Sequence, residues 1–402
     1  MNNKYLVING GSSSLKFSMY EMPNEKLLIN GYFEKIGFED SFWTIKINGE
    51  KIRKEGYLVN HSAAVKIMIE ELINNKIIDS MDEIIGVGHR VLHGGEIYSD
   101  SVEITEKVLN DIIDLTKLGP LHHPGQIAGI KAMLECLPNV RQVAVFDTAF
   151  HQTMPEYNYM YAVPYEWYSK YKVRKYGFHG TSHKYITEYM KKKLNREDVN
   201  LIICHVGSGA SISCVKNGLC YNTTMGLTPL DGLVMGTRSG NIDASIIKYI
   251  MEETGKDIDE VINDLNKNSG LIGICGKNDF RDVLSKKNNG DDLGILAYNM
   301  FMNSIIKYIG EYYFSLEGDV DAIVFTAGVL ENNVGLREDI INKLSNTLGI
   351  YLNKDMNNNI GYGHDMNEGM ITTDESKLQV WVIPTDEEIM IARDSYEIIN
   401  KA

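Results

Sequence analysis

Alternating apolar and polar positions open the chain and return near its middle. Residues 4–8 (KYLVI) and 15–22 (LKFSMYEM) predict two strands joined by the small-residue turn NGGSSS. Residues 200–224 repeat this design, with an apolar strand, a glycine and serine turn and a second strand. Two such hairpins, one in each half, predict two related domains that face each other across a cleft.

Helical spacing of apolar residues fills much of the remaining chain. It predicts helices at residues 61–75, 101–118, 124–137, 181–194, 242–253, 257–266, 278–287, 293–316, 337–349 and 387–400. Further strands are expected at residues 32–38, 42–49, 51–59, 84–95, 141–150, 321–328 and 378–384. Strands and helices are mixed throughout, so the pattern predicts the α/β class, with a domain boundary near Phe150 where the texture changes.

Length and charge narrow the choice of partners. A chain of 402 residues is long enough for two or three domains, and its net charge of -14 argues against nucleic acid and anionic membranes as partners. No run of about 18 apolar residues occurs, the N-terminus lacks a signal-peptide pattern, and the five cysteines are widely spaced. We therefore expect a cytoplasmic protein that binds neither nucleic acid nor membrane.

Two arginines in glycine-rich surroundings are candidate anion ligands. Arg90 lies in GHRVLHGG and Arg238 in MGTRSGNID. Strand alternation places Arg90 and Leu92 on one face and His89 on the other. A fixed cation beside a short apolar side chain suits a carboxylate with a small alkyl group, although Arg90 taken singly fits a structural salt bridge equally well.

Other segments could handle phosphate and a metal ion. NGGSSSLK offers backbone amides and hydroxyls to a phosphate, or is an ordinary polar hairpin tip. His122 lies in the constrained turn PLHHPG, and His179 stands between glycines ahead of a helix, where an anion would be favoured. Asp147 and Glu387 follow predicted strands, which is typical of Mg²⁺ ligands and also of helix caps.

Together these segments resemble the acetokinase family. The motifs VINGGSSSLKF, GHRVLHGGE, GPLHHP, VFDTAFHQTMP, YGFHGTSH, MGTRSG, FTAG followed by EN, and IPTDEEIMIARD stand in that family's order over essentially the whole chain. The resemblance implies two actin-like (ribonuclease H-like) domains with a nucleotide cleft between them. It assigns residues 1–149 and 385–402 to the N-terminal domain, and residues 150–384 to a C-terminal domain that holds the nucleotide site and the contacts of a homodimer.

The resemblance also implies an activity: reversible, Mg²⁺-dependent, in-line transfer of the γ-phosphoryl group of ATP to acetate, giving acetyl phosphate and ADP. Mn²⁺ is an alternative ion. Carried over by motif, the catalytic residues would be Arg90, Asp147, His179 and Arg238, with Asn9 and Glu387 at the metal. The acetate would meet Arg90, Leu92, Leu121, His122, Phe178 and Pro229. The nucleotide and its phosphates would meet Ser12, Lys16, His205, Gly207, Ser208, Gly209, Asp279, Phe280, Arg281, Gly328, Val329, Leu330, Glu331 and Asn332.

Departures from the family pattern cluster at the nucleotide. Ser208 replaces an amide side chain, Leu330 replaces a glycine and is expected to narrow the adenosine pocket, Asn241 replaces an acid, and His123 replaces an asparagine. These changes keep open a different phosphoryl donor, either pyrophosphate or another nucleotide. A propionate or butyrate kinase and a non-enzymatic actin-like nucleotide switch are the remaining alternatives.

Overall fold

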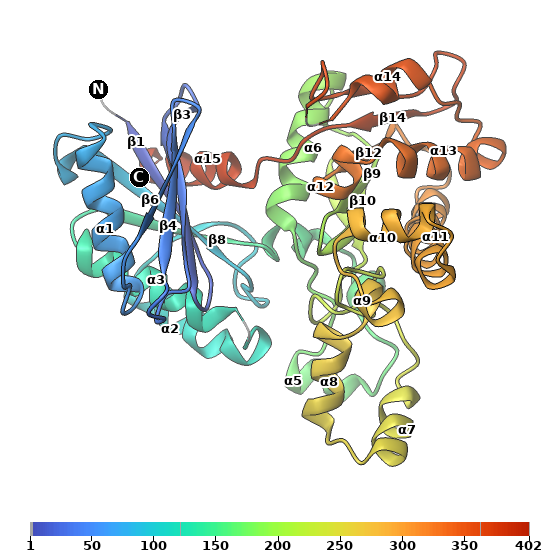
Figure 1. The fold of residues 1–402 in the computed structure, drawn as a ribbon, viewed down its shortest axis with the longest axis horizontal. Coiled ribbons are helices and arrows are strands. Elements are labelled where there is room, and N and C mark those ends of the chain that lie inside the picture. Colours follow the sequence, from blue (N-terminus) through green and yellow to red (C-terminus); the bar gives the residue numbers. More distant parts are fainter. Residues whose placement is uncertain (1–2, 121, 362, 402) are drawn as a thin grey trace. The chain divides into compact units, whose positions relative to one another are not determined.

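The computed structural model describes residues 3–120, 122–361 and 363–401, and the chain divides into two compact units. The first unit runs to Gln152 and resumes at Asp386, and the second is Thr153–Thr385. Figure 1 shows both with their helices and strands. Each unit mixes strands and helices, which confirms the predicted α/β class.

In the described residues of the first unit, the strands form an eight-stranded sheet in the order β5-β4-β3-β2-β1-β6-β8-β7. The strands are β1 (Lys4–Gly10), β2 (Ser14–Glu21), β3 (Lys26–Glu34), β4 (Phe42–Ile47), β5 (Glu50–Glu55), β6 (Ile84–Val91), β7 (Val102–Glu103) and β8 (Arg141–Phe146). β1, β6 and β8 are parallel neighbours, whereas the strands from β1 through β5 are joined antiparallel.

The second unit repeats the central part of this topology. Its described strands are β9 (Leu201–Val206), β10 (Ala210–Lys216), β11 (Leu219–Thr223), β12 (Ala322–Thr326), β13 (Gly369–Met370) and β14 (Gln379–Val382), in the order β11-β10-β9-β12-β14-β13. β9 pairs antiparallel with β10 and parallel with β12, as β1 does with β2 and β6. The predicted pair of opening hairpins is therefore confirmed, and each hairpin begins the sheet of its own unit.

Helices cover the sheets. The first unit has α1 (His61–Asn74), α2 (Glu106–Asp114), α3 (His123–Cys136) and α15 (Glu387–Asn400). The second has α4 (Glu156–Tyr159), α5 (Tyr165–Tyr171), α6 (Gly180–Leu194), α7 (Ser245–Thr254), α8 (Ile258–Lys267), α9 (Gly270–Cys275), α10 (Phe280–Asn288), α11 (Asp292–Ser315), α12 (Gly328–Asn332), α13 (Val334–Leu348) and α14 (Lys354–Asn359). Short 3-10 helices lie at Met81–Glu83, Leu115–Leu118 and Ala149–Thr153.

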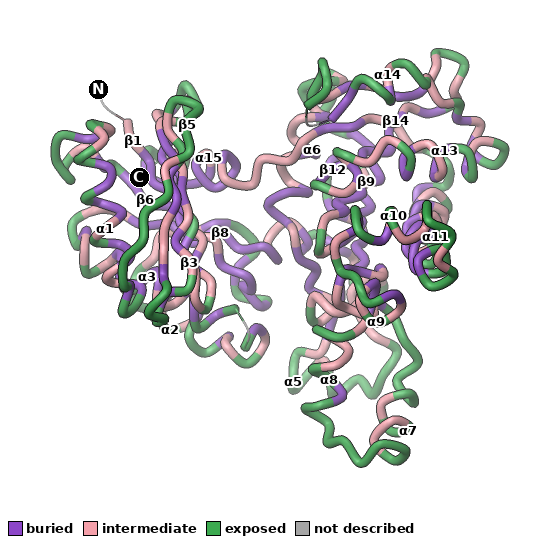
Figure 2. Tube along the Cα trace, viewed as in Figure 1, coloured by how far each residue is buried: buried purple, intermediate pink, exposed green. Residues whose placement is uncertain are grey.

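The first sheet is a layer between helices. α1 and α3 lie on one face and α15 on the other (Figure 1). The apolar cluster against α1 and α3 is fully buried at Leu6, Phe33, Val65 and Met68 among others, and the buried central strands of both units stand out in Figure 2. Removal of this apolar surface from water holds the strand ends, where the polar residues lie, in fixed positions.

Two predictions about elements are wrong. The helix expected at 101–118 begins only at Glu106, because Val102 and Glu103 pair with β8 and the Thr105 side chain caps the helix by accepting from the Val108 amide. The strand expected at 32–38 is instead β3, which ends at Glu34, where the chain turns through Lys35 and Gly37 at φ of 57° and 92°. In the described part of the chain no helix is both long enough and apolar enough to cross a bilayer.

Close packing of α3 on the first hairpin depends on glycine. A Cβ on Gly125 would lie 2.3 Å from the Gly11 carbonyl oxygen and 2.6 Å from the Ser12 amide nitrogen. No other residue fits there, because a side chain would displace backbone rather than a flexible neighbour. The start of α3, with His122 at its N-cap, is thereby held beside the hairpin tip.

Candidate functional site

A small polar cavity of the first unit collects the residues predicted to bind an anion. Its volume is about 180 Å³. It is lined by Asn9, Gly10, Gly11, Ser14, Lys16, Arg90, Leu92, His122 and Gln126. β1 and β2 place Asn9 directly opposite Lys16, and Arg90 and Leu92 reach the cavity together as strand alternation predicts. One guanidinium, one ammonium and one apolar side chain around a small space suit a small carboxylate or a phosphate group.

Arg90 is held by the buried carboxylate of Asp147. Its Nε lies 3.1 Å from both carboxylate oxygens, and its Nη2 donates to Oδ2 at 2.7 Å. Asp147 is 1% exposed and follows β8, whereas 23% of the Arg90 side chain is exposed. Burial raises the pKa of Asp147 and Arg90 opposes this rise, while the Asp147 charge raises the pKa of Arg90. The salt-bridge alternative for Arg90 is therefore correct, and the guanidinium still lines the cavity.

Hard oxygen donors for a metal ion gather around this pair. Glu387 is the first residue of α15 and is close enough to raise the pKa of both Arg90 and Asp147. Asn9 lines the same cavity as Arg90. Among the described residues no group of three or more His, Cys, Asp or Glu side chains could hold a metal ion alone. The set fits Mg²⁺, which takes one or two protein carboxylates and keeps several waters.

One residue expected at the phosphates does not line this cavity. Ser12 is exposed at the hairpin turn, where the Gly11 amide donates to the Ser14 carbonyl and so directs Ser14, rather than Ser12, toward the cavity. Leu121, expected at the acetate methyl, lies outside the described residues.

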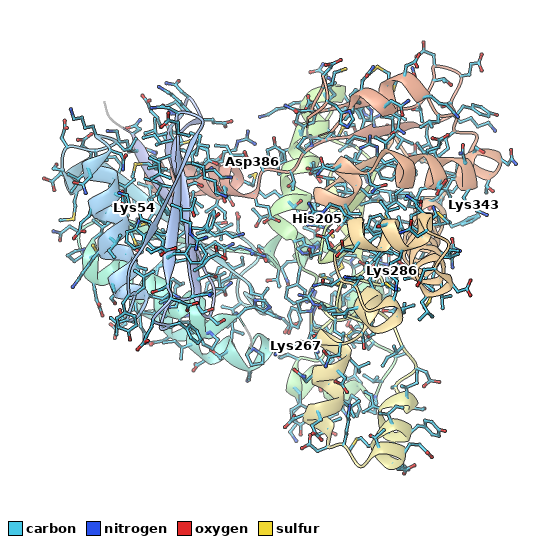
Figure 3. The ribbon with its side chains drawn as sticks, viewed as in Figure 1. Lys54, His205, Lys267, Lys286, Lys343 and Asp386 are labelled. Carbon is cyan, nitrogen blue, oxygen red and sulfur yellow. The ribbon has the colours of Figure 1, made fainter. Side chains whose placement is uncertain are left out.

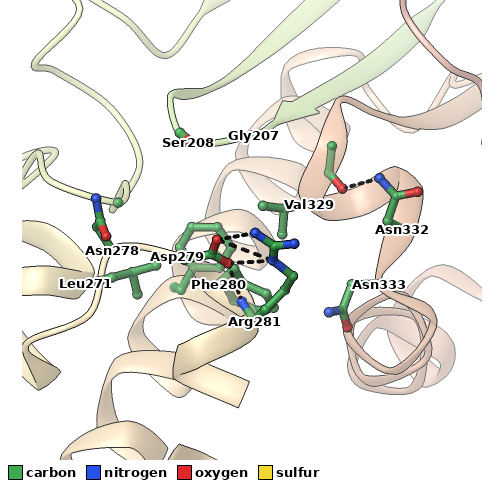
Figure 4. A pocket seen from close by; sticks show the side chains of 13 residues that line it. Gly207, Ser208, Leu271, Asn278, Asp279, Phe280, Arg281, Val329, Asn332 and Asn333 are labelled. Atoms are coloured by element: carbon green, nitrogen blue, oxygen red, sulfur yellow. Dashed lines mark hydrogen bonds and ion pairs between the residues drawn. The ribbon is translucent and has the colours of Figure 1, made fainter. Parts of the chain in front are cut away.

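The second unit contains a larger cavity of about 560 Å³ at the turn of its own hairpin. It is lined by Gly207, Ser208, Gly236, Leu271, Asn278, Asp279, Phe280, Arg281, Phe301, Gly328, Val329, Asn332 and Asn333 (Figure 4). Both apolar side chains and side-chain amides line this cavity. The amides can form hydrogen bonds with polar groups at the edge of a ligand, so the combination is typical of sites for small planar ligands. Asp279 caps α10 and is bonded by Arg281, whose hydrogen bonds lower the pKa of Asp279 to about 2.

Leu330 does not narrow this cavity, so that prediction is wrong. Leu330 is fully buried and is absent from the lining, whereas Val329 faces the cavity (Figure 4). The reason is the short helix α12, which turns successive side chains in different directions, so that Leu330 packs into the core.

Glu331 also lies outside the lining and braces α12 instead. Its carboxylate accepts hydrogen bonds from the amides of Ala327 at 2.6 Å and Thr385 at 3.1 Å. Ala327 has φ of +66°, a conformation that costs free energy for a residue with a Cβ. Glu331 therefore stabilises the strained backbone at Ala327, where α12 begins.

His179 and Arg238 meet at the tip of the second hairpin. A Cβ added to Gly209 would lie 3.5 Å from Arg238 Nη1 and 3.5 Å from His179 Nε2. His179 precedes α6 with φ of +57°, an uncommon conformation outside glycine that is frequent at functional sites. The two side chains thus point a guanidinium and an imidazole edge at the same glycine turn.

The surroundings of Arg238 leave its guanidinium available to bind an anion. In the described part of the chain its hydrogen bonds go to the Pro229 carbonyl at 3.3 Å and the Met235 sulfur at 3.6 Å, with no carboxylate within ion-pair distance. Burial lowers the pKa of Arg238. Phe178 is 1% exposed, so its ring belongs to the core next to His179. Because this half-buried arginine has no carboxylate partner, it favours the binding of an anion.

The ring of His205 packs against the ring of His179. The two rings are stacked with centroids 4.2 Å apart, and His205 Nδ1 is 2.7 Å from Ser182 Oγ. His205 is 8% exposed and, like Gly209, is absent from the cavity lining. Figure 3 labels it among the side chains of the second unit.

Several lining residues were missed from the sequence. Gln126 accepts a hydrogen bond from the Leu92 amide at 3.0 Å, and Asn278, Phe301 and Asn333 line the larger cavity. They lie in helices or at helix ends without a glycine-rich motif, so only contacts between distant segments identify them.

The chain is similar to known proteins over nearly its whole length. The model of the "Acetokinase family" matches residues 4–393. The acetate kinase of Bacillus cytotoxicus is 51% identical over 401 residues, covering 99% of each chain. The structure of Porphyromonas gingivalis acetate kinase is 41% identical with a TM-score of 0.92, covering 99% of this chain and 100% of that one. A propionate kinase structure from Francisella tularensis is equally similar, at 41% identity and a TM-score of 0.92, covering 98% and 100%. The chain belongs to the acetokinase family.

Proposed function

We propose that this protein catalyses reversible transfer of the γ-phosphoryl group of ATP to acetate, giving acetyl phosphate and ADP. The observation that carries the proposal is the convergence of His179 and Arg238 on the glycine turn of Gly209, on the hairpin that also lines the larger cavity. Full-length identity near 50% to acetate kinases supports the same activity.

Acetate is assigned to the small cavity of the first unit. Arg90, oriented by Asp147, would pair with the carboxylate, and Leu92 would contact the methyl group. A volume of about 180 Å³ leaves room for a short acid and a phosphate oxygen. His122 and Pro229 remain proposed contacts of the same substrate, whereas the buried ring of Phe178 belongs to the core.

Phosphoryl transfer requires positioning and charge neutralisation more than covalent chemistry. His179 would donate a hydrogen bond to an equatorial phosphoryl oxygen, and Arg238 would neutralise charge that develops there. Lys16 would approach the phosphates from the first unit.

Asn9, Asp147 and Glu387 would hold the waters of a Mg²⁺ ion, or of Mn²⁺ in its place. When bound, the ion would neutralise phosphate oxygens. Asp147 is buried and the charge of Glu387 raises its pKa, which supports this role because two like charges beside one another favour a bound cation.

The nucleotide is assigned to the cavity of about 560 Å³. Leu330 does not obstruct this cavity, but Ser208, another departure from the family pattern, lines it and keeps pyrophosphate or another nucleotide open as donor. Initial rates with ATP, GTP and pyrophosphate, with acetyl phosphate trapped as its hydroxamate, test this assignment. Pyrophosphate or GTP surpassing ATP would contradict it, and no acyl phosphate with any donor would favour the non-enzymatic switch.

Propionate is the second candidate acceptor, because a propionate kinase structure is as similar as an acetate kinase structure. One methylene changes binding in an apolar pocket by about 1–3 kcal/mol, so discrimination is expected to be partial. We expect a higher kcat/KM for acetate than for propionate or butyrate. The reverse order would assign the enzyme to the longer acid.

We also propose that the protein is a homodimer and that its compact units are the family's two domains. Helix α7 has no buried residue although it carries Ile246 and Tyr249, which are 43% and 62% exposed. Apolar side chains exposed in this way support a protein contact on the second unit. The cytoplasmic location stays a prediction from the sequence.

A further inference from the structure

A buried serine joins two histidines directly behind the proposed catalytic centre. Ser211 Oγ lies 2.9 Å from His179 Nδ1 and 2.8 Å from His183 Nε2. The His183 amide donates to the His179 carbonyl at 3.0 Å where α6 begins, and both imidazoles reach Ser211 of β10. Ser211 and His183 are each 0% exposed, so water does not compete for these hydrogen bonds.

One hydroxyl group cannot donate to both nitrogens. It has one proton and two lone pairs, so it donates to one imidazole while it accepts from the other, or accepts from both. A neutral imidazole that donates from Nε2 must accept at Nδ1. If His179 is to donate from Nε2 to the phosphoryl group, Ser211 must donate to its Nδ1 and His183 must donate from Nε2 to Ser211.

We propose that Ser211 and His183 are positioning residues that hold His179 in its Nε2–H form, ready to donate to the transferring phosphoryl group. This inference rests on the proposed function for its catalytic consequence, but the protonation pattern itself does not. The stacked ring of His205, 4.2 Å from His179, adds to the effect, because two imidazolium ions at that distance would repel each other.

The protonation pattern is tested directly by NMR of protein with ¹⁵N-labelled histidine. Correlations from ring protons to both nitrogens distinguish the Nε2–H form from the Nδ1–H form, and the spectrum of His179→Gln identifies the His179 signals. We expect wild-type His179 to be in the Nε2–H form and Ser211→Ala to populate the Nδ1–H form measurably. A wild-type His179 in the Nδ1–H form, or the same pattern in Ser211→Ala, would overturn the proposal.

Kinetics test the consequence. We expect Ser211→Ala to lower kcat at least about tenfold while the KM values for acetate and ATP change less than about threefold, since the hydroxyl orients a catalytic group without touching substrate. Ser213→Ala is the matched control, because Ser213 is equally buried two residues along β10 but bonds Thr223 Oγ1 at 3.1 Å. It should keep nearly full activity.

A second pair of variants covers the case in which Ser211→Ala does not fold. His183→Gln retains an N–H donor in place of Nε2 and should keep more activity than His183→Leu by at least about fivefold. Equal losses in the two variants, or an equal fall of kcat in Ser213→Ala and Ser211→Ala, would indicate a merely structural role and overturn the proposal. If wild type makes no acetyl phosphate, the proposed function fails, while the NMR comparison still decides the protonation pattern.

Discussion

At the scale of single residues, the two site arginines differ in what neutralises them. Arg90 is bound by Asp147 through three hydrogen-bond contacts, whereas Arg238 bonds only neutral atoms in the described chain. The sequence places both in similar glycine-rich motifs and does not distinguish them. The structure assigns Arg90 a structural role in addition to its position in the cavity, and Arg238 no such role.

Substituting each arginine with methionine should separate these roles. Arg238→Met is expected to reduce kcat/KM at least about 1,000-fold with a change in unfolding free energy below about 1 kcal/mol. Arg90→Met should also abolish activity and cost about 3–5 kcal/mol, because it leaves the Asp147 carboxylate buried without its partner. Urea unfolding beside the hydroxamate assay measures both, and equal stability losses in the two variants would contradict this distinction.

A buried histidine away from the site makes stability depend on pH. His89 is 2% exposed and bonds Gln142 Oε1 at 2.7 Å, and burial lowers its pKa to about 4 from 6.5. The unfolded chain therefore binds one more proton than the folded chain between these values. This contribution is fully present above pH 6.5 and is lost as the pH falls toward 4.

Between pH 7 and pH 5 this single group should cost about 2 kcal/mol, at about 1.4 kcal/mol per pH unit below 6.5. Urea unfolding of wild type and His89→Gln at both pH values tests the prediction. The wild type should lose about 2 kcal/mol more than the variant over this interval. Parallel losses in the two proteins would mean that His89 does not titrate on unfolding.

At the scale of elements, α12 is positioned by a buried arginine that the motifs do not reveal. Arg337 is 0% exposed and donates to the carbonyls of Leu330 at 3.0 Å, Glu331 at 2.5 Å, Asn357 at 2.7 Å and Ile360 at 2.9 Å. These carbonyls include the C-terminal end of α12, which hydrogen bonds within the helix cannot satisfy. Arg337 therefore ties α12, which lines the larger cavity of the second unit, to the chain around α14.

Arg337→Met should loosen this wall without reaching the acetate cavity. We expect the KM for ATP to rise about tenfold or more and the KM for acetate to change less than about twofold. Arg196, which is exposed and paired with Asp198, provides the surface control Arg196→Met, for which both values should stay unchanged. A folded Arg337→Met protein with an unaltered KM for ATP would disprove the bracing role.

At the scale of the whole molecule, the second unit exposes apolar side chains that its own fold does not bury. α7 packs with α8, yet none of its residues is buried, and Ile258 at the start of α8 is 48% exposed. Figure 2 shows most of this region in the colours of exposed and intermediate residues. Covering it with a second copy would remove apolar area from water.

Light scattering of the native protein should give about twice the chain mass of 45.3 kDa. Replacing both Ile246 and Tyr249 with glutamate should shift the mass to that of one chain, because four charges would face each other across a symmetric contact. Tyr57→Glu, at an equally exposed tyrosine of the first unit, is the control and should stay dimeric. A dimer that tolerates the double variant would place the interface elsewhere.

The sequence by itself determined the α/β class, the duplicated hairpins and the family, because glycine-rich turns and strand alternation are local signals. The same signals made Arg90, His179 and Arg238 candidate site residues, which stays a prediction. Only the tertiary structure decided that Leu330 turns away from the larger cavity, that Asp147 holds Arg90, and that Ser211 lies between two histidines. These contacts join residues far apart in the chain, so packing rather than local pattern sets the direction of each side chain.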